Sequence, residues 1–201
     1  MGNIIGVQHV PFAATAEMTT AAHVSFDSFV RVVDLTTGQE KWKAKGAEQR
    51  VTALAFSPEG RLLAAAPGFQ EAPVRLWDVE SGKQLGTLEG HRRFVQSLVF
   101  WPDGKTLATA SGDQTVRLWD VETRRLLKTL RGHKLEVWSL ALLPDNGTLA
   151  SGSKDGEVYL WDTSATRAKQ AFATIPRSIQ SWRYADDGEA VITVDDDGRI
   201  E

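Results

Sequence analysis

The sequence contains no cysteine. Disulfide bonds, zinc–thiolate sites and cysteine nucleophiles are therefore excluded, and a reducing, cytoplasmic compartment is the expected location. No apolar run approaches the roughly 18 residues that a membrane-spanning helix needs. The first residues, Met-Gly-Asn-Ile-Ile-Gly, have neither a basic segment nor a long apolar core, so no secretory signal peptide is expected.

An excess of positive charge is also missing, because 23 Lys and Arg stand against 26 Asp and Glu, giving a formal net charge of −3. Neither nucleic acid nor an anionic membrane is therefore an expected partner. Phosphate-binding loops and dinucleotide fingerprints are absent, and His9 and His23 lack metal-ligand spacing. Asp195, Asp196 and Asp197 form a tract without the spaced ligands of a calcium loop. We expect no cofactor and no metal.

The most informative feature that is present is a repeated Trp-Asp pair. It occurs three times at a spacing of 42 residues, as Trp77-Asp78, Trp119-Asp120 and Trp161-Asp162. A period of about 40–45 residues that ends in Trp-Asp is typical of a propeller blade, with one four-stranded sheet per repeat. The last two units agree over the whole period, from the Gly-His pair at 90–91 and 132–133 to the Trp-Asp pair.

Fainter copies flank these units. The segment Val51 to Asp78 has the same order of elements, and Ile179 to Glu201 matches the first part of a unit. Upstream, Phe12 and the segment Val30 to Asp34 keep the same internal spacing as Phe56 and the segment Val74 to Asp78, with Val33 in place of Trp. The second unit is two residues longer than the later units between its second and third strands, in a Pro/Gly-bounded loop at residues 66–73. On this alignment the first unit has the same extra length, around Phe26.

Within one unit, four short strands are predicted and no helix. They are Val95 to Phe100, ended by a Pro-Asp-Gly turn, then Thr106 to Ala110, Thr115 to Trp119 and Leu126 to Leu130. Apolar and polar residues mix at short range without a sustained 3.6-residue stripe. The expected class is all-β.

On these residues the chain resembles the WD-repeat β-propeller family, over nearly its whole length and most specifically from Val74 to Asp162. The resemblance implies a propeller of four-stranded antiparallel blades that is incomplete, with about four full blades and a partial fifth. We expect a single domain, 1–201, built from repeat units at about 1–34, 35–78, 79–120, 121–162 and 163–201.

The resemblance also implies a hydrogen-bonded tetrad in each complete unit, made from His, Ser or Thr, Asp and Trp. The matching residues are His91, Thr109, Asp113 and Trp119 in one unit, and His133, Ser151, Asp155 and Trp161 in the next. The same residue types make up a hydrolase triad. A structural network explains their repetition at one period, whereas an active site does not, so no catalytic residue is predicted.

Binding in such folds generally uses the loops at one rim of the rigid frame. Trp138 stands out because its counterparts, Gln96 and Thr52, are polar, so the repeat does not require Trp there. It is either a binding residue at the rim or a filler between blades. Residues 92–94 and 134–136 form matching loops in two consecutive units, and these loops are either part of a binding surface or merely solvated. The candidate partner-binding residues are Trp138, Phe94, Arg92, Arg93, Lys134, Glu136 and Phe69.

Propellers usually close with roughly 4–8 blades. The chain has about four and a half units, so we expect it to be a fragment of a longer protein, to pair with a second copy that completes the ring, or to need another partner. The predicted function is a non-catalytic protein–protein interaction scaffold that binds a protein or peptide through its rim loops. The alternative is a regulatory or sensory propeller segment of a larger multidomain enzyme, such as a kinase.

Overall fold

The computed structural model describes residues 11–25, 29–45, 50–68 and 73–163 in full, together with the backbone of three later strands. Every regular element in this part of the chain is a β-strand, so the predicted all-β class is confirmed. No helix in it has the length and apolarity that crossing a bilayer requires.

The strands form four four-stranded antiparallel sheets and one two-stranded sheet. We call them blades 1 to 5. Blade 1 contains β1 (Phe12–Ala14), β2 (Thr20–Val24), β3 (Phe29–Asp34) and β4 (Glu40–Lys45); blade 2 contains β5 (Val51–Phe56), β6 (Leu62–Pro67), β7 (Val74–Asp78) and β8 (Gln84–Leu88); blade 3 contains β9 (Val95–Phe100), β10 (Thr106–Ser111), β11 (Thr115–Asp120) and β12 (Leu126–Arg131); blade 4 contains β13 (Val137–Leu142), β14 (Thr148–Ser153), β15 (Glu157–Asp162) and β16 (Ala168–Thr174); blade 5 contains β17 (Ile179–Tyr184) and β18 (Val191–Asp195).

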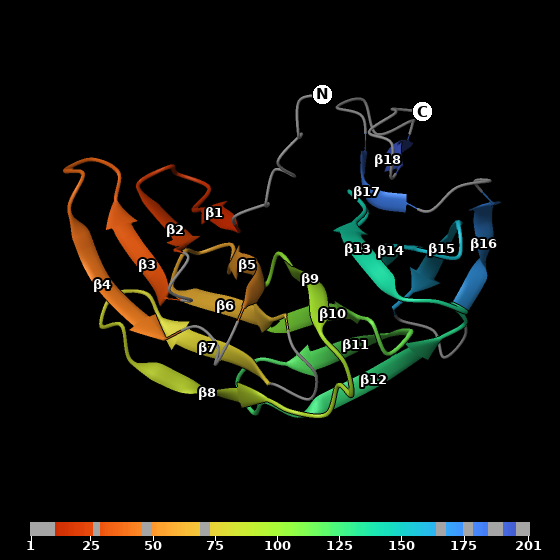
Figure 1. Cartoon of the computed structure of the whole chain (residues 1–201), viewed down its shortest axis with the longest axis horizontal. Coiled ribbons are helices and arrows are strands. Elements are labelled where there is room, and N and C mark those ends of the chain that lie inside the picture. The colour runs from red at the N-terminus through yellow and green to blue at the C-terminus, as the bar shows by residue number, and fades with distance from the viewer. Residues whose placement is uncertain are drawn as a thin grey trace, which may run out of the picture.

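The described strands follow an arc with blade 1 at one end and blade 5 at the other (Figure 1). The first strand of each blade lies on the inner side of the arc, where β5 contacts β1 and β9, and β13 contacts β9 and β17. The fourth strands, β4, β8, β12 and β16, lie on the outside. Each of blades 1 to 4 therefore has one outer edge strand and meets its neighbours through the faces of the sheet.

The core lies between consecutive blades, and a tryptophan belongs to each of its three larger clusters. Trp77 packs in a buried cluster with Val30 and Val32 of blade 1. Trp119 packs with Val74 and Leu76 of blade 2, and Trp161 does the same with residues of blade 3. Each indole side chain is almost fully buried. The face of a blade that carries Trp, which we call its leading face, thus packs on the preceding blade, and burial of this large apolar area stabilises the stack.

The Asp of each Trp-Asp pair closes the turn into the outer strand. The Asp78 carboxylate accepts hydrogen bonds from the backbone N–H and the hydroxyl of Ser81. Asp120 accepts the same pair of bonds from Thr123. Hydrogen bonds to the charged form favour it, so the Ser81 hydroxyl holds the pKa of Asp78 below its ordinary value. This turn chemistry explains why Asp follows Trp in the repeat.

The alignment of the first repeat was wrong. The paired ends of the second and third strands are 14 positions apart in blades 1 and 3 and 16 apart in blade 2 (Thr20↔Asp34, Thr106↔Asp120 and Leu62↔Asp78). Ala14, which pairs with Ala21, is therefore the counterpart of Phe56, and Phe12 is not. Only blade 2 has the longer connection. The error arose because Val33 replaces the Trp that anchors the alignment, so the sequence did not show where the first unit differs in length. Phe26 itself lies outside the described residues.

Candidate functional site

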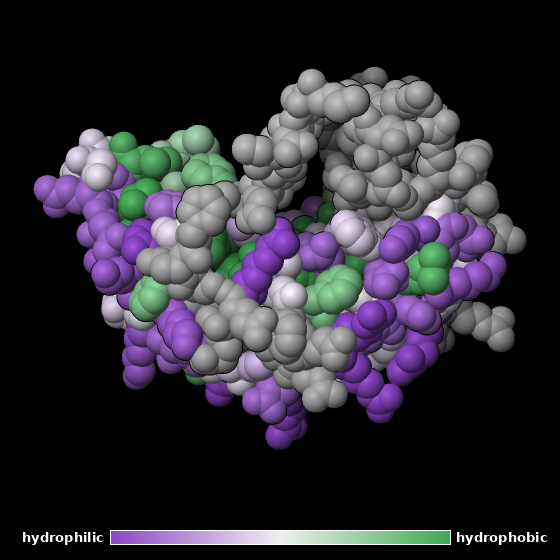
Figure 2. Space-filling view, in the orientation of Figure 1, coloured by the Kyte–Doolittle hydropathy of each residue, from purple (hydrophilic) through white to green (hydrophobic). Residues whose placement is uncertain are grey.

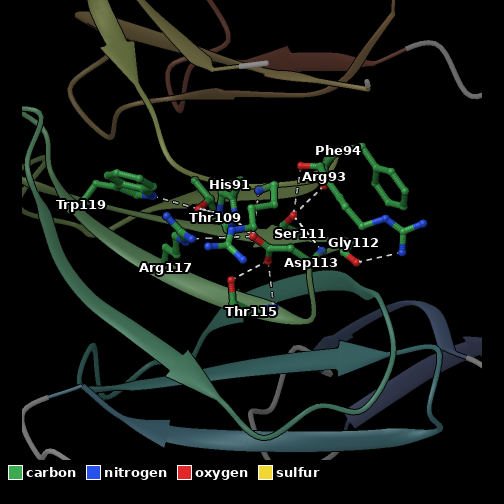
Figure 3. Close-up of polar contacts among 11 residues, drawn as sticks. His91, Arg93, Phe94, Thr109, Ser111, Gly112, Asp113, Thr115, Arg117 and Trp119 are labelled. Atoms are coloured by element: carbon green, nitrogen blue, oxygen red, sulfur yellow. Dashed lines mark hydrogen bonds and ion pairs between the residues drawn. The ribbon is translucent and has the colours of Figure 1, made fainter. Parts of the chain in front are cut away.

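Four side chains of blade 3 form one continuous line of hydrogen bonds (Figure 3). The indole Nε1–H of Trp119 donates to the Thr109 Oγ1 at 2.9 Å. The Thr109 hydroxyl lies 2.6 Å from Nε2 of His91, and Nδ1 of His91 lies 2.8 Å from a carboxylate oxygen of Asp113. The line joins β11 and β10 to the two loops that precede β9 and β11. It therefore ties the buried interior of the blade to its rim.

The direction of each proton in this line follows from chemistry. An indole nitrogen is only a donor, so the Thr109 oxygen accepts from it and its own hydrogen points to His91 Nε2. A carboxylate is only an acceptor, so His91 Nδ1 carries the proton that faces Asp113. Burial lowers the pKa of His91, and the neighbouring Asp113 only partly opposes this. The imidazole is therefore neutral, with its proton on Nδ1.

Asp113 is the residue that connects this network to the rim loop. Besides His91, its carboxylate accepts the backbone N–H of Arg92 at 3.2 Å and both the N–H and the hydroxyl of Thr115. Burial would raise the pKa of Asp113, but the hydrogen bonds from His91 and Thr115 outweigh it and hold that pKa well below the ordinary value. The charged Asp113 carboxylate thus fixes where Arg92 leaves the blade.

Blade 4 repeats the arrangement. Trp161 donates to Ser151 at 2.8 Å, the Ser151 hydroxyl lies 2.8 Å from His133 Nε2, and His133 Nδ1 lies 3.2 Å from Asp155. Asp155 also accepts the backbone N–H of Lys134 at 2.7 Å. The ring of Tyr159 stacks on His133 with the centroids 4.4 Å apart, where blade 3 has Arg117 instead. Both sets of four predicted tetrad residues are therefore brought together.

These networks have the residue types of a hydrolase triad but a different geometry. The hydroxyls of Thr109 and Ser151 belong to fully buried side chains, and each accepts a bond from a buried indole. A nucleophile must reach a substrate carbonyl, and neither hydroxyl reaches the surface. Among the described residues no cluster of three or more His, Cys, Asp and Glu side chains has the arrangement of a metal site.

The position of Thr109 is filled differently in the first two blades, and the sequence comparison did not show this. The strand register places Ala65 there in blade 2 and His23 there in blade 1, opposite Arg75 and Arg31. Neither blade thus has a Ser or Thr hydroxyl at the place where the tryptophans of blades 3 and 4 donate. Pairing of strands, rather than residue type, is the signal that identifies these positions.

Most of the predicted rim residues lie together between blades 3 and 4. The Phe94 ring covers Gly112, because a Cβ placed on that glycine would lie 2.6 Å from the ring. The backbone N–H of Gly112 donates to the Phe94 carbonyl, which joins the two loops of blade 3. Arg93 crosses to blade 4, where its guanidinium contacts Glu136 at 3.3 Å, and it also lies over the Phe94 ring.

The cations on this rim are more exposed than the anions. Arg92 and Lys134 project into solvent, and Arg93 is exposed along about half of its side chain. Asp113 and Asp155 are almost buried, and Glu136 is largely covered. Because the acids have low exposure and short pairs, the exposed charge of this rim is mainly positive, beside the half-buried ring of Phe94.

Trp138 lies apart from this cluster. It is the second residue of β13 and is half-buried, and its indole nitrogen is shielded from solvent without an acceptor among the described residues. At the same place in blade 2, the Thr52 hydroxyl donates to the carbonyl of Val95 in the next inner strand. The side chain at this position thus faces the neighbouring inner strand, which favours a filler between blades 4 and 5. Phe69 lies outside the described residues.

The opposite rim holds a polar cleft that the sequence did not indicate. It has a volume of about 260 Å³ and lies between the turns of blades 1 and 2. Lys41, Glu80, Arg61 and Asp78 are among the residues that line it, and Lys41 contacts Glu80 at 3.3 Å. The charges in the cleft are thus partly paired with one another.

Comparison with known families agrees with this architecture. Residues 82–120 and 124–162 each match the family model described as "WD domain, G-beta repeat". Residues 17–93 match the model described as "Anaphase-promoting complex subunit 4 WD40 domain". The fold and these matches define a WD-type β-propeller, and the chain belongs to the WD-repeat family. Domains of this family generally serve as protein-interaction scaffolds and are typically non-catalytic. No curated protein gives a significant match to the chain.

Proposed function

We propose that this chain is a non-catalytic scaffold that binds a protein or peptide partner through the rim between blades 3 and 4. The observation that carries the proposal is the way each tetrad Asp holds a rim loop by its backbone, at Arg92 in blade 3 and at Lys134 in blade 4. The buried networks thereby preorganise exposed side chains, and preorganisation lowers the entropic cost of binding.

The chemistry of this rim favours an acidic or polar peptide over other partners. Phe94 supplies an apolar ring, and Arg92, Arg93 and Lys134 supply exposed cations around it. Arg and aromatic residues are the side chains most enriched at energetically important positions of protein interfaces. The net charge of −3 over the whole chain disfavours polyanions such as nucleic acid, because the rest of the surface would repel them.

The test is a selection of peptides from a random display library on the purified chain, followed by affinity measurements on the selected peptides. Phe94→Ala should weaken binding by about tenfold or more, the effect typical of an aromatic residue at the centre of an interface. Trp138→Ala is measured in parallel, because a residue that only fills the gap between blades has no direct effect on affinity.

The matched control is Met18→Ala, since Met18 is an exposed large apolar residue in the first turn of blade 1. It should leave the affinity unchanged. Equal affinity of the selected peptides for the natural chain and for the variants Phe94→Ala and Arg92→Ala would show that the rim is not the binding surface.

A specific observation also supports self-association. The leading face of blade 1 is uncovered in the described part of the chain, and hydrophobic residues gather over that end of the arc (Figure 2). Leu35 is 43% exposed, although its counterparts Val79 and Val121 are 4% and 7% exposed. Phe12 is also exposed, whereas its counterpart Leu54 is half-buried. Such a face is an apolar surface that another sheet can cover.

We propose that a second copy covers this face and thereby extends the arc toward a ring. Light scattering should show a dimer that dissociates in the variant Phe12→Ser with Leu35→Ser. The control Leu135→Ser, which changes an equally exposed leucine on the rim, should leave the dimer intact. A monomeric natural chain at the highest soluble concentration would contradict self-association and leave the rim proposal untouched.

A further inference from the structure

The outer strand of blade 3 exposes two consecutive leucines, whereas β8 exposes one leucine and β4 none at the equivalent positions. Leu126 is 44% exposed and Leu127 is 57% exposed, and both begin β12. The strand is the last in its sheet, so its outer edge has no partner strand among the described residues. The equivalent residues of β4 are Glu40 and Lys41, which suit an edge that must stay single.

The exposed leucines are not required by the packing of the blade. A shift in register opposite Leu118 and Trp119 marks a bulge at the start of β12. The same shift occurs in blades 1 and 2, where polar Glu40 and Gln84 stand in place of Leu126. The inward-facing residue of β12 is Leu130, which is buried. The fold thus accepts polar residues at the bulge, and the two leucines serve no internal contact that the other blades need.

Positive charge surrounds the leucines. Residues 124–131 contain Arg124, Arg125, Lys128 and Arg131 and no acidic residue, in a chain whose net charge is −3. Neither Arg125 nor Arg131 forms an ion pair within the described part of the chain, and both are exposed. A local charge of this sign on an otherwise acidic protein attracts an acidic partner.

Arg124 extends the same surface to the next blade. Its guanidinium donates to the Leu85 carbonyl of β8 at 3.2 Å, and its Cδ lies 2.5 Å from the place where a Cβ on Gly86 would stand. The glycine thus makes room for the arginine side chain to lie along β8. Leu85, whose carbonyl accepts this bond, is also exposed.

We propose that the β12 edge binds an extended, acidic segment of a partner protein, which adds to blade 3 as a fifth strand. Backbone hydrogen bonds to the open edge would supply the affinity, as in other cases of strand addition. Apolar side chains of the segment contact the two leucines at the start of β12, and its carboxylates contact Arg125 before the strand and Arg131 at its end. This surface is separate from the Phe94 rim and does not depend on the function proposed for that rim.

The probe is a fluorescently labelled peptide of alternating Val and Glu, measured by anisotropy on the purified full chain. It should bind, and the variant Leu126→Ser with Leu127→Ser should weaken it by about tenfold or more, because two exposed apolar contacts are removed. The control Leu135→Ser, an exposed leucine on the rim, should bind like the natural chain. A Val-Lys peptide of the same length should not bind.

The contribution of positive charge and the formation of backbone hydrogen bonds are tested separately. Arg125→Glu with Arg131→Glu should abolish binding, and Lys105→Glu, which reverses an exposed charge in the turn between β9 and β10, should not. Amides of residues 128–131 should gain protection from hydrogen exchange when the peptide is bound. Binding that is insensitive to both β12 variants would overturn the proposal. So would binding of phosphatidylserine vesicles, but not of the peptide, through Leu126 and Leu127, because the surface would then recognise a membrane.

Discussion

Trp119 and Thr109 are joined by a hydrogen bond of 2.9 Å inside blade 3, from the indole N–H to a hydroxyl with no exposure to solvent. The bond gives the tryptophan of the repeat a second role besides packing. It fixes the rotamer of Thr109, and through Thr109 the orientation of His91 and the position of the rim loop. Packing, polar satisfaction and surface geometry are therefore coupled in one blade.

Replacing Thr109 by Val should test this coupling. The side-chain shape is kept, but the Trp119 N–H loses its acceptor and His91 Nε2 loses its donor. Two buried polar atoms without partners should cost about 2–4 kcal/mol of unfolding free energy. Urea denaturation followed by tryptophan fluorescence measures it. Thr87→Val, at a half-buried threonine whose hydroxyl donates to the exposed Glu89, is the control and should change stability by less than about 0.5 kcal/mol. Equal effects of the two substitutions would mean that the network contributes nothing.

Stability should fall as the pH falls below about 6.5, the ordinary pKa of histidine. Burial lowers the pKa of His91 and of His133 in the folded chain, so the unfolded chain takes up more protons in this range. Unfolding therefore becomes easier toward low pH. Below the ordinary pKa of Asp, loss of charge from Asp113 and Asp155 adds to the effect, because both pKa values are lowered on folding.

The measurement is the urea midpoint at pH 7.5, 6 and 5. The double variant His91→Gln with His133→Gln should be less stable at pH 7.5 but should show a shallower loss between pH 6.5 and 5. Gln84→Asn, which changes an exposed uncharged residue outside both tetrads, should keep the natural slope. An unchanged slope in the double variant would assign the pH dependence to other groups.

Two glycines in the equivalent turns of blades 1 and 2 allow the cost of backbone strain to be separated from the cost of a side-chain clash. Gly38 and Gly82 both have φ near +70°, and each donates its N–H to the backbone carbonyl of the Asp four residues earlier. Nothing lies within 4 Å of a Cβ on Gly38, whereas a Cβ on Gly82 would lie 2.8 Å from the Trp42 ring. Trp42 in turn donates to the Val79 carbonyl at 2.7 Å.

Gly38→Ala should therefore cost roughly 1 kcal/mol from the left-handed backbone alone. Gly82→Ala should cost at least about 1 kcal/mol more, because the Trp42 ring must move and its hydrogen bond to Val79 is strained. Thermal unfolding of the two variants checks this, and near-ultraviolet circular dichroism reports the Trp42 environment. If the two variants are equally stable, Trp42 adjusts without cost.

Periodicity predicted the blades well, because the residues that mark it are held by local geometry. Trp119 and Asp120 recur because one fills the space between sheets and the other closes a turn. Blade 1 was misaligned because it lacks one of these marker residues. Val33 replaces its Trp, so nothing in the sequence fixed the strand register that places Ala14 opposite Ala21.

The candidate site was predictable where residues share a loop and unpredictable where they meet across blades. Phe94 and Arg93 are neighbours in sequence, and so their proximity is trivial. The contact of Arg93 with Glu136, and the position of Arg124 along Gly86, depend on how two blades pack together. Residue type alone indicated neither, since an exposed Arg on a loop has many available partners.

Trp138 and Trp161 provide the last comparison, within a single blade. Trp161 donates to Ser151 at 2.8 Å, whereas the buried indole nitrogen of Trp138 has no acceptor in the described residues. Trp161→Phe should therefore cost about 1–3 kcal/mol from the orphaned Ser151 and lost packing, and Trp138→Phe should be neutral or slightly stabilising, because an unsatisfied donor is removed. Urea denaturation of both variants gives the difference directly. A Trp138→Phe variant as unstable as Trp161→Phe would show that the Trp138 indole makes a bond across to blade 5, and that this side chain joins the blades instead of serving the rim.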